Sequence, residues 1–190
     1  MRPEFYARSA LDVARDLLGM ILTREGPEGG VRVSGRIVET EAYTGADDPA
    51  SHAAARIGRT ERNDPLFGPP GTAYIHLNYG VHWCLNAVTG AEGEGSGVLI
   101  RALEPLEGLD TMRARREGRD DLTNGPARLT RALAIGPELQ RHPLDEPPLV
   151  VSAGEPLPDA RVGRTPRIGI SRAADRLYRF TDERSAWLSR

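Results

Sequence analysis

Two acidic side chains and one aromatic side chain alternate near the end of a predicted strand, Arg36-Ile-Val-Glu-Thr-Glu-Ala-Tyr43. Because side chains alternate across a β-strand, Glu39, Glu41 and Tyr43 should share one face with Ile37. Two carboxylates beside an aromatic ring are suited to acid–base chemistry when burial tunes the pKa of one of them. The alternative is a solvated face of an edge strand, on which the carboxylates do no chemistry.

A second group of residues lies on a predicted β-hairpin with Tyr79 at its tip. Tyr74, His76 and Asn78 alternate onto one face of its first strand. An aromatic side chain at a hairpin tip is suited to act as a wedge between stacked bases. Rings below the tip are suited to stack on a planar ligand. The alternative is ordinary cross-strand packing of aromatic side chains.

Three histidines, His52, His76 and His82, could hold a metal ion and so support a metal-dependent hydrolase. Their spacing is irregular, and Cys84 is the one cysteine, so the usual zinc-ligand patterns are missing from the sequence. We therefore expect no metal site, and activity that is insensitive to chelators would exclude this hydrolase. A serine hydrolase is also disfavoured, because the sequence has no Gly-x-Ser-x-Gly elbow.

The composition is that of an ordinary folded domain: 190 residues, of which 39% are hydrophobic and 27% charged. The sequence has no apolar run of membrane-spanning length and no apolar stretch near Met1 of the kind that a secretory signal needs. The single cysteine excludes an intrachain disulfide and favours the cytoplasm. All 25 basic residues are Arg. A lysine Schiff base and a phosphate loop of the Gly-Lys-Ser/Thr type are thereby excluded.

Charge is distributed unevenly around the small net value of −2. Residues 161–190 carry eight Arg against three acidic residues, whereas residues 1–160 are net acidic. A basic patch is typical of a protein that binds a polyanion. The alternative is a solvated terminal surface.

The predicted elements mix helices and strands without regular alternation, which favours an α+β fold. Hydrophobic spacing predicts a helix within 9–22 that ends at Gly19 before an extended 20–24. Residues 44–71 have no clear periodicity, as expected of a long functional loop. The remaining expectations are strands at 31–43, 72–79, 81–88 and 98–103, helices at 106–119 and 126–135, a connector at 143–158 and a return to the sheet within 160–180.

The sequence resembles the alkyladenine (3-methyladenine) DNA glycosylase family, of the alkyl-purine type. The matching segments run in the family's order and cover nearly the whole chain: 36–43, 62–63, 70–74, 79–80, 83–86, 99–107, 124–129 and 166–170. The resemblance implies one DNA glycosylase domain over residues 1–190. It would be an α+β domain with a curved antiparallel sheet, flanking helices, long loops and a protruding hairpin.

The resemblance also implies catalytic and DNA-contacting roles. Glu41 corresponds to the general base, and Arg101 to the arginine beside the catalytic water and the substrate phosphate. Tyr79 corresponds to the tyrosine that inserts into the duplex where the damaged nucleotide leaves.

Further roles implied by the resemblance concern the base pocket. Tyr43 would stack on the flipped purine, and His52 would form a hydrogen bond with its edge. Asn86 would exclude normal guanine by crowding its exocyclic amine. His76 departs from the family, which often has a second stacking tyrosine there, so it should alter lesion preference. An unperturbed histidine would also gain charge below about pH 6.5.

We therefore expect a monofunctional glycosylase acting on alkylated or deaminated purines, namely 3-methyladenine, 7-methylguanine, hypoxanthine and ethenoadenine. Its partner would be double-stranded DNA with damaged purines, and it would need no cofactor. It would be a monomer in the cytoplasm, associated with the nucleoid and not with a membrane. The alternative is a non-catalytic module that binds damaged DNA or RNA. Glu41 discriminates between the two, because a binding module does not need it and phosphates would repel it.

Overall fold

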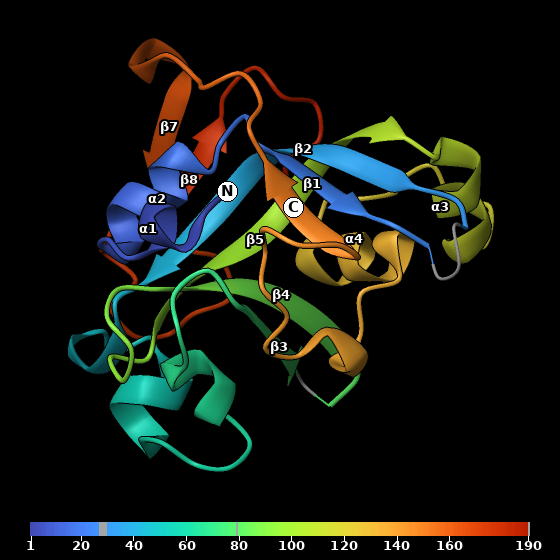
Figure 1. Ribbon diagram of the computed structural model, residues 1–190. Coiled ribbons are helices and arrows are strands. Elements are labelled where there is room, and N and C mark those ends of the chain that lie inside the picture. The colour runs from blue at the N-terminus through green and yellow to red at the C-terminus, as the bar shows by residue number, and fades with distance from the viewer. Residues whose placement is uncertain (27–29, 79, 190) are drawn as a thin grey trace.

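The computed structural model describes residues 1–26, 30–78 and 80–189, which form an antiparallel eight-stranded sheet with short helices around it (Figure 1). The main strand order is β3-β4-β5-β2-β1-β6, and β8 joins β2 to β7. The strands are β1 (Ile21–Arg24), β2 (Val33–Tyr43), β3 (Ala73–Asn78), β4 (His82–Thr89), β5 (Ser96–Glu107), β6 (Leu149–Ser152), β7 (Val162–Thr165) and β8 (Arg179–Asp182). The α-helices are α1 (Pro3–Tyr6), α2 (Ala10–Asp16), α3 (Leu109–Arg115) and α4 (Pro126–Leu133). The predicted α+β class with an antiparallel sheet is confirmed.

Strand β2 is central, and its neighbour changes partway along. It pairs with β5 on one edge, while its other edge pairs first with β1 and then, at residues 39–41, with β8. The β2–β5 register shifts between Ile37 and Glu39. Ile37 consequently packs in the hydrophobic core with Ala42, and the expectation that it shares the face of the two carboxylates is wrong.

The core lies between the sheet and helices α2 and α4. Val13 of α2, Leu17 directly after this helix, and Leu129 and Leu133 of α4 are fully buried there. Ser9 caps α2, as its position predicts, by accepting a hydrogen bond from a backbone N–H in the first turn. These helices hold one face of the sheet rigid, which fixes the residues on the opposite face.

Some boundaries differ from the prediction. Strand β5 continues to Glu107, so α3 begins at Leu109 and not at residue 106. The proline-rich stretch 143–158 contains β6, which pairs with β1. This strand is four residues long and is preceded by two prolines, so its local pattern resembles a connector. Its pairing partner lies more than 120 residues away in sequence, where no local pattern can reveal it.

The irregular segment after β2 forms three short helical elements at one end of the sheet, teal in Figure 1. They are the 3₁₀ helices η2 (Gly45–Asp47) and η4 (Asp64–Phe67) and the π-helix η3 (His52–Ile57). The glycine-rich loop 90–97 packs against this segment. Gly95 has φ +70°, and a Cβ there would lie 2.4 Å from the Phe67 ring. The loop therefore supports the segment by close packing.

The described residues also form the 3₁₀ helices η5 (Pro137–Leu139) and η6 (Asp159–Arg161). Helix η5 follows α4 and contacts β3. Helix η6 leads directly into β7, the strand that reaches the rest of the sheet through β8. The predicted return of residues 160–180 to the sheet is thus confirmed at its two ends, with a loop between them.

Candidate active site

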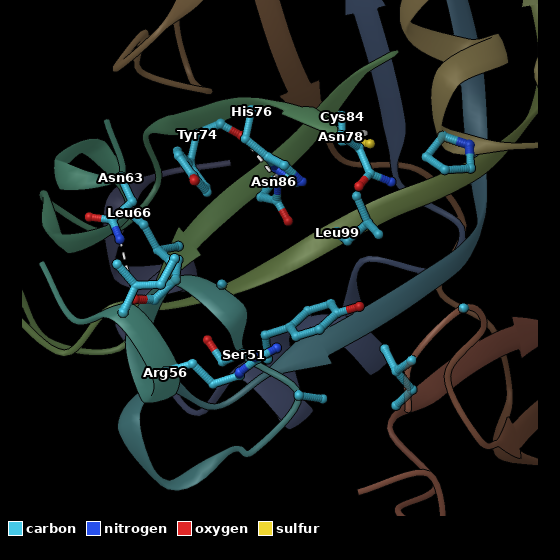
Figure 2. Close-up of a pocket in the computed structure, with 18 of the residues that line it drawn as sticks. Ser51, Arg56, Asn63, Leu66, Tyr74, His76, Asn78, Cys84, Asn86 and Leu99 are labelled. Carbon is cyan, nitrogen blue, oxygen red and sulfur yellow. Dashed lines mark hydrogen bonds between the residues drawn. The ribbon is translucent and has the colours of Figure 1, made fainter. Parts of the chain in front are cut away.

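A large cavity opens between the β3–β4 hairpin, the helical segment after β2 and the loop that precedes β8. Its volume is about 820 Å³, within the range of about 300–1,000 Å³ that is usual for small-molecule pockets. Figure 2 shows side chains of the hairpin and of the helical segment around the same open space. The cavity has room for a planar ligand of nucleobase size.

Glu41 is fully buried behind residues that line this cavity. Three donors from residues that line the cavity surround its carboxylate. The Tyr43 hydroxyl donates to Oε2 at 3.0 Å, and the Ile168 backbone N–H donates to Oε1 at 2.7 Å. Arg101 Nη1 lies 3.3 Å from Oε1. Burial raises the pKa of Glu41 above its ordinary value, although the Arg101 charge opposes this. Such a carboxylate is suited to act as a general base.

Glu39 is equally buried but is held by a different set of donors. Arg101 and Arg179 each donate a guanidinium Nε–H to Oε1, at 2.9 and 2.8 Å. Ser189 donates its backbone N–H at 2.6 Å and its hydroxyl at 2.7 Å. Burial alone would raise the pKa of Glu39, but the hydrogen bonds of Arg179 and Ser189 outweigh it and lower the pKa. The predicted pair thus separates into a clamped carboxylate and one with a raised pKa, and the solvated-face alternative is wrong.

Tyr43 is held from behind by Arg167, whose guanidinium carbon lies 4.7 Å from the ring centroid. Arg167 forms a bidentate ion pair with Asp48, and neither side chain is exposed. It also donates to the Ala42 carbonyl at 2.8 Å. The ring of Tyr43 is therefore fixed in orientation, and it lines the cavity as a stacking surface would.

Arg101 links the two carboxylates. Its Nε binds Glu39, its Nη1 lies beside Glu41, and its Nη2 donates to the Ser189 hydroxyl at 3.1 Å. It is 7% exposed and lines the cavity. All three nitrogen atoms are thus engaged by protein groups, so its clearest effect is to hold positive charge beside Glu41.

The hairpin face predicted from alternation is confirmed. Tyr74, His76 and Asn78 line the cavity, and Asn86 joins them from β4. The Tyr74 and His76 rings stack with centroids 5.4 Å apart. Burial, with a contribution from the Arg62 charge, lowers the pKa of His76 to about 4. The sequence-based expectation that His76 gains charge below about pH 6.5 is therefore corrected to a lower pH.

Two predicted residues cannot be placed in the site. Tyr79 lies outside the residues that the structure describes. His52 begins the π-helix η3, but its side chain also lies outside that description. His82, the third histidine of the metal hypothesis, is exposed at the start of β4. Within the described part of the chain, no group of three or more His, Cys, Asp or Glu residues is arranged to hold a metal ion.

The basic C-terminal part is less available to a polyanion than its composition suggests. Arg161 pairs with Asp182, Arg167 with Asp48, and Arg179 with Glu39. These three arginines form ion pairs within the protein, so their charges are not free to bind a polyanion. Arg172, by contrast, is exposed and lines the cavity.

Several residues that organise the site had no role assigned from the sequence. Arg167 lies in the matched segment 166–170, so its position there was a signal. Asn63 lies in the matched pair 62–63 and donates to the carbonyls of Ala53 and Gly58 at 3.2 and 2.7 Å. It thereby holds the segment around η3 together. Asp48 and Ser189 gave no sequence signal, because their partners are more than 100 residues away.

The fold and the cavity define the class: an α+β protein that places a buried carboxylate behind a cavity lined by aromatic rings. The sequence profile of the methylpurine-DNA glycosylase family, MPG, matches residues 4–186. The chain belongs to this family of DNA glycosylases.

Curated relatives agree over nearly the full length. A protein from Nitrosospira multiformis is 49% identical over 187 residues, covering 97% of this chain and 91% of that protein. One from Salinibacter ruber is 47% identical, covering 93% and 89%. One from Carboxydothermus hydrogenoformans is 45% identical, covering 98% and 97%. All three carry the name "Putative 3-methyladenine DNA glycosylase". Among the described residues, no helix has the length and apolar character required to cross a membrane.

Proposed function

We propose that this protein is a monofunctional glycosylase that hydrolyses the N-glycosidic bond of alkylated or deaminated purines in duplex DNA. The observation that carries the proposal is Glu41, a carboxylate with a raised pKa whose partners line a cavity that has room for a nucleobase. Buried carboxylates are costly unless a function or a partner retains them. Glu39 has the partners of a structural carboxylate, whereas Glu41 has those of a base.

In the proposed reaction, Glu41 activates a water molecule. A carboxylate offers about four acceptor positions, and three donors surround Glu41 in the free protein. One position thus remains for water. The water oxygen forms a bond to the sugar C1′, the C1′–N bond breaks with its electron pair going to the purine, and Glu41 takes the proton.

The identity of the base decides how readily it leaves. A cationic purine such as 3-methyladenine or 7-methylguanine departs as a neutral molecule and needs no further proton. A neutral lesion such as hypoxanthine or ethenoadenine needs a proton or a hydrogen bond to carry the developing negative charge. Tyr43 would stack on either kind of base, with Asn86 and His76 at its side and His52 at its edge.

The DNA must be opened for a purine to reach the cavity. We propose that Tyr79, at the hairpin tip, fills the space that the flipped nucleotide leaves. Arg62 and Arg172 are exposed and line the cavity, so they supply positive charge for the phosphate backbone. The protein would act as a monomer on nucleoid DNA in the cytoplasm, with no cofactor.

Substitution of the hairpin tip tests the wedge. We expect Tyr79→Ala to reduce excision from lesion duplexes about 5- to 150-fold, because stacking on an aromatic ring is worth about 1–3 kcal/mol per base. Excision from single strands should fall much less, since they have no stack to hold open. Equal losses on both substrates would assign Tyr79 a structural role.

The product should be an intact abasic site. Water is the proposed nucleophile, and the sequence has no lysine to attack the sugar. Borohydride treatment during the reaction should therefore trap no covalent adduct between protein and DNA. A trapped adduct would show lyase chemistry and contradict the monofunctional assignment.

A base-release assay tests the function as a whole. Matched duplexes carrying 3-methyladenine, 7-methylguanine, hypoxanthine or ethenoadenine are incubated with the protein in excess, and the free base is quantified. We expect release of at least one of them. Binding of lesion duplexes without release of any base would favour the non-catalytic module.

A further inference from the structure

A backbone carbonyl determines which way the Asn86 amide is turned. Asn86 Nδ2 lies 3.2 Å from the Tyr74 carbonyl oxygen. Because a carbonyl oxygen can only accept a hydrogen bond, the NH₂ group must be on this side of the amide. The second N–H of the same group reaches His76 Nδ1 at 3.1 Å, and Figure 2 shows these two side chains together on the cavity wall.

The Asn86 amide in turn determines the tautomer of His76. A ring nitrogen that accepts a hydrogen bond cannot carry a hydrogen, so the neutral imidazole must carry it on Nε2. Burial keeps the ring neutral, with the nearby Arg62 charge contributing to its low pKa. Both N–H groups of Asn86 are engaged, so the atom that it can offer to a ligand is Oδ1.

The cavity wall therefore presents a fixed pair of groups: a donor, His76 Nε2–H, and an acceptor, Asn86 Oδ1. Both residues line the cavity. Among the residues whose side chains the structure describes, none forms a hydrogen bond with either atom. Neither His76 Nε2 nor Asn86 Oδ1 is a fully buried atom that lacks a hydrogen-bond partner, so both have accessible surface. Both are thus available to a ligand.

We propose that this relay from the Tyr74 carbonyl through Asn86 to His76 sets the hydrogen-bonding polarity of the base pocket, with Asn86 positioning His76 as a donor. The inference rests on the proposed function in taking a purine as the ligand. A 6-oxo purine such as hypoxanthine offers an acceptor at O6 beside a donor at N1, which complements the wall. A 6-amino purine such as 3-methyladenine offers the reverse order at these two positions. The wall favours the 6-oxo class.

The tautomer can be measured in the whole protein without any substrate. Nitrogen-15 NMR at pH 7 should show His76 protonated at Nε2 and bare at Nδ1, with the signal assigned through His76→Gln. In Asn86→Asp the new carboxylate can only accept, so the hydrogen should move to Nδ1 or the ring should become cationic. In Asn86→Ala the preference should weaken toward a mixture. A wild-type ring protonated at Nδ1, or a tautomer unchanged in both variants, would overturn the relay.

Excision tests whether the wall recognises the base. His76→Phe keeps a ring beside Tyr74 but removes both nitrogen atoms, so hypoxanthine release should fall about 2- to 10-fold relative to 3-methyladenine release, the value of one neutral hydrogen bond. His76→Gln can both accept from Asn86 and donate to the base, and should restore part of that loss. Equal effects on both lesions would show that His76 only packs in the wall.

These two experiments separate the relay from the proposed function. A wild-type protein that shows the Nε2 tautomer but releases no modified purine would overturn the glycosylase proposal and, with it, the assignment of a purine to the wall. A protein that releases purines but has the other tautomer would retain its function and lose the relay.

Discussion

Glu39 and Glu41 are two residues apart on β2, equally buried, and in contact with the same Arg101, yet their surroundings differ in kind. Glu39 faces the C-terminal part of the chain, where Arg179 and Ser189 complete its hydrogen bonds. Glu41 lies behind residues that line the cavity, and its donors are a hydroxyl, one backbone N–H and the shared arginine. The pKa of Glu39 is lowered and that of Glu41 is raised.

The difference shows how one strand can carry two buried carboxylates whose pKa values shift in opposite directions. Burial is the largest influence on both groups, and it favours the protonated form in each. What separates them is the number and charge of the donors. Carboxylates whose environments push their pKa values apart are the usual basis for assigning acid and base roles. Substitutions at the two positions should therefore have different consequences.

The largest effect is expected from Glu41→Gln. Removing the general base should lower single-turnover base release about 10²- to 10⁴-fold. Lesion binding should persist or tighten, because a negative charge near DNA is lost. Single-turnover time courses give the rate of base release, and equilibrium titrations with the same duplex give the binding affinity. Release close to that of the wild type would refute the assignment of Glu41 as the general base.

Glu39→Gln should mainly affect stability. It leaves Arg179 and part of Arg101 without a carboxylate in a buried site, and breaking one side of a buried ion pair costs about 3–5 kcal/mol. Urea unfolding monitored by tryptophan fluorescence should show this loss, whereas Glu41→Gln, which removes a desolvated charge, serves as the matched control. Equal loss of stability in both variants would remove the distinction between the two carboxylates.

The pH dependence of base release and of stability should also distinguish Glu41 from Glu39. Glu41 must be ionised to accept a proton, and its pKa is raised. Base release should therefore decline, as pH falls, at a higher pH than that of an ordinary glutamate near 4.3. Glu39, with its lowered pKa, stabilises the folded state at pH values above its unfolded-state pKa. This stabilisation is lost as the pH falls through its folded-state pKa.

The sign is opposite for Glu41. Because its pKa is raised on folding, Glu41 favours the folded state at pH values below its unfolded-state pKa. This contribution to stability is lost as the pH rises through its folded-state pKa. The stability of Glu41→Gln relative to the wild type should therefore increase with pH, while that of Glu39→Gln should decrease. Unfolding curves across about pH 2.5–8 would measure both trends, because the Glu39 trend lies at and below the ordinary glutamate value near 4.3 and the Glu41 trend lies above it. If the rate of base release instead declined with a midpoint at the pKa of an ordinary glutamate, burial would not be raising the pKa of Glu41.

The smallest expected effect comes from Tyr43→Phe. This substitution keeps the ring over Arg167 but removes the hydroxyl that donates to Glu41. Losing a hydrogen bond to the charged form should raise the pKa of Glu41 further and move the acid limb of the release profile to higher pH. A reduction in release of about 10- to 150-fold at neutral pH corresponds to one hydrogen bond to a charged group, worth about 1.5–3 kcal/mol. An unchanged acid limb would show that the hydroxyl does not tune the base.

Local patterns predicted much of the frame that carries the site. Alternation placed Glu39, Glu41 and Tyr43 on one face and put Tyr74 and His76 together, because side chains in a strand must alternate. The same rule failed at Ile37, where a register shift interrupts the strand. Composition also did not show that three arginines of the basic C-terminal part, Arg161, Arg167 and Arg179, pair with carboxylates from distant parts of the chain.

The sequence by itself determined which chemical groups are present and which families they resemble: a carboxylate pair on a strand, rings on a hairpin, and no lysine anywhere. Only the tertiary structure decided that the pKa values of the two carboxylates shift in opposite directions, since Ser189 is 150 residues from Glu39 and Ile168 is 127 residues from Glu41. Charge, burial and donor number set a pKa, and these depend on groups that the folded chain brings together. The same holds for His76, whose tautomer is set by a neighbouring strand and not by its own segment.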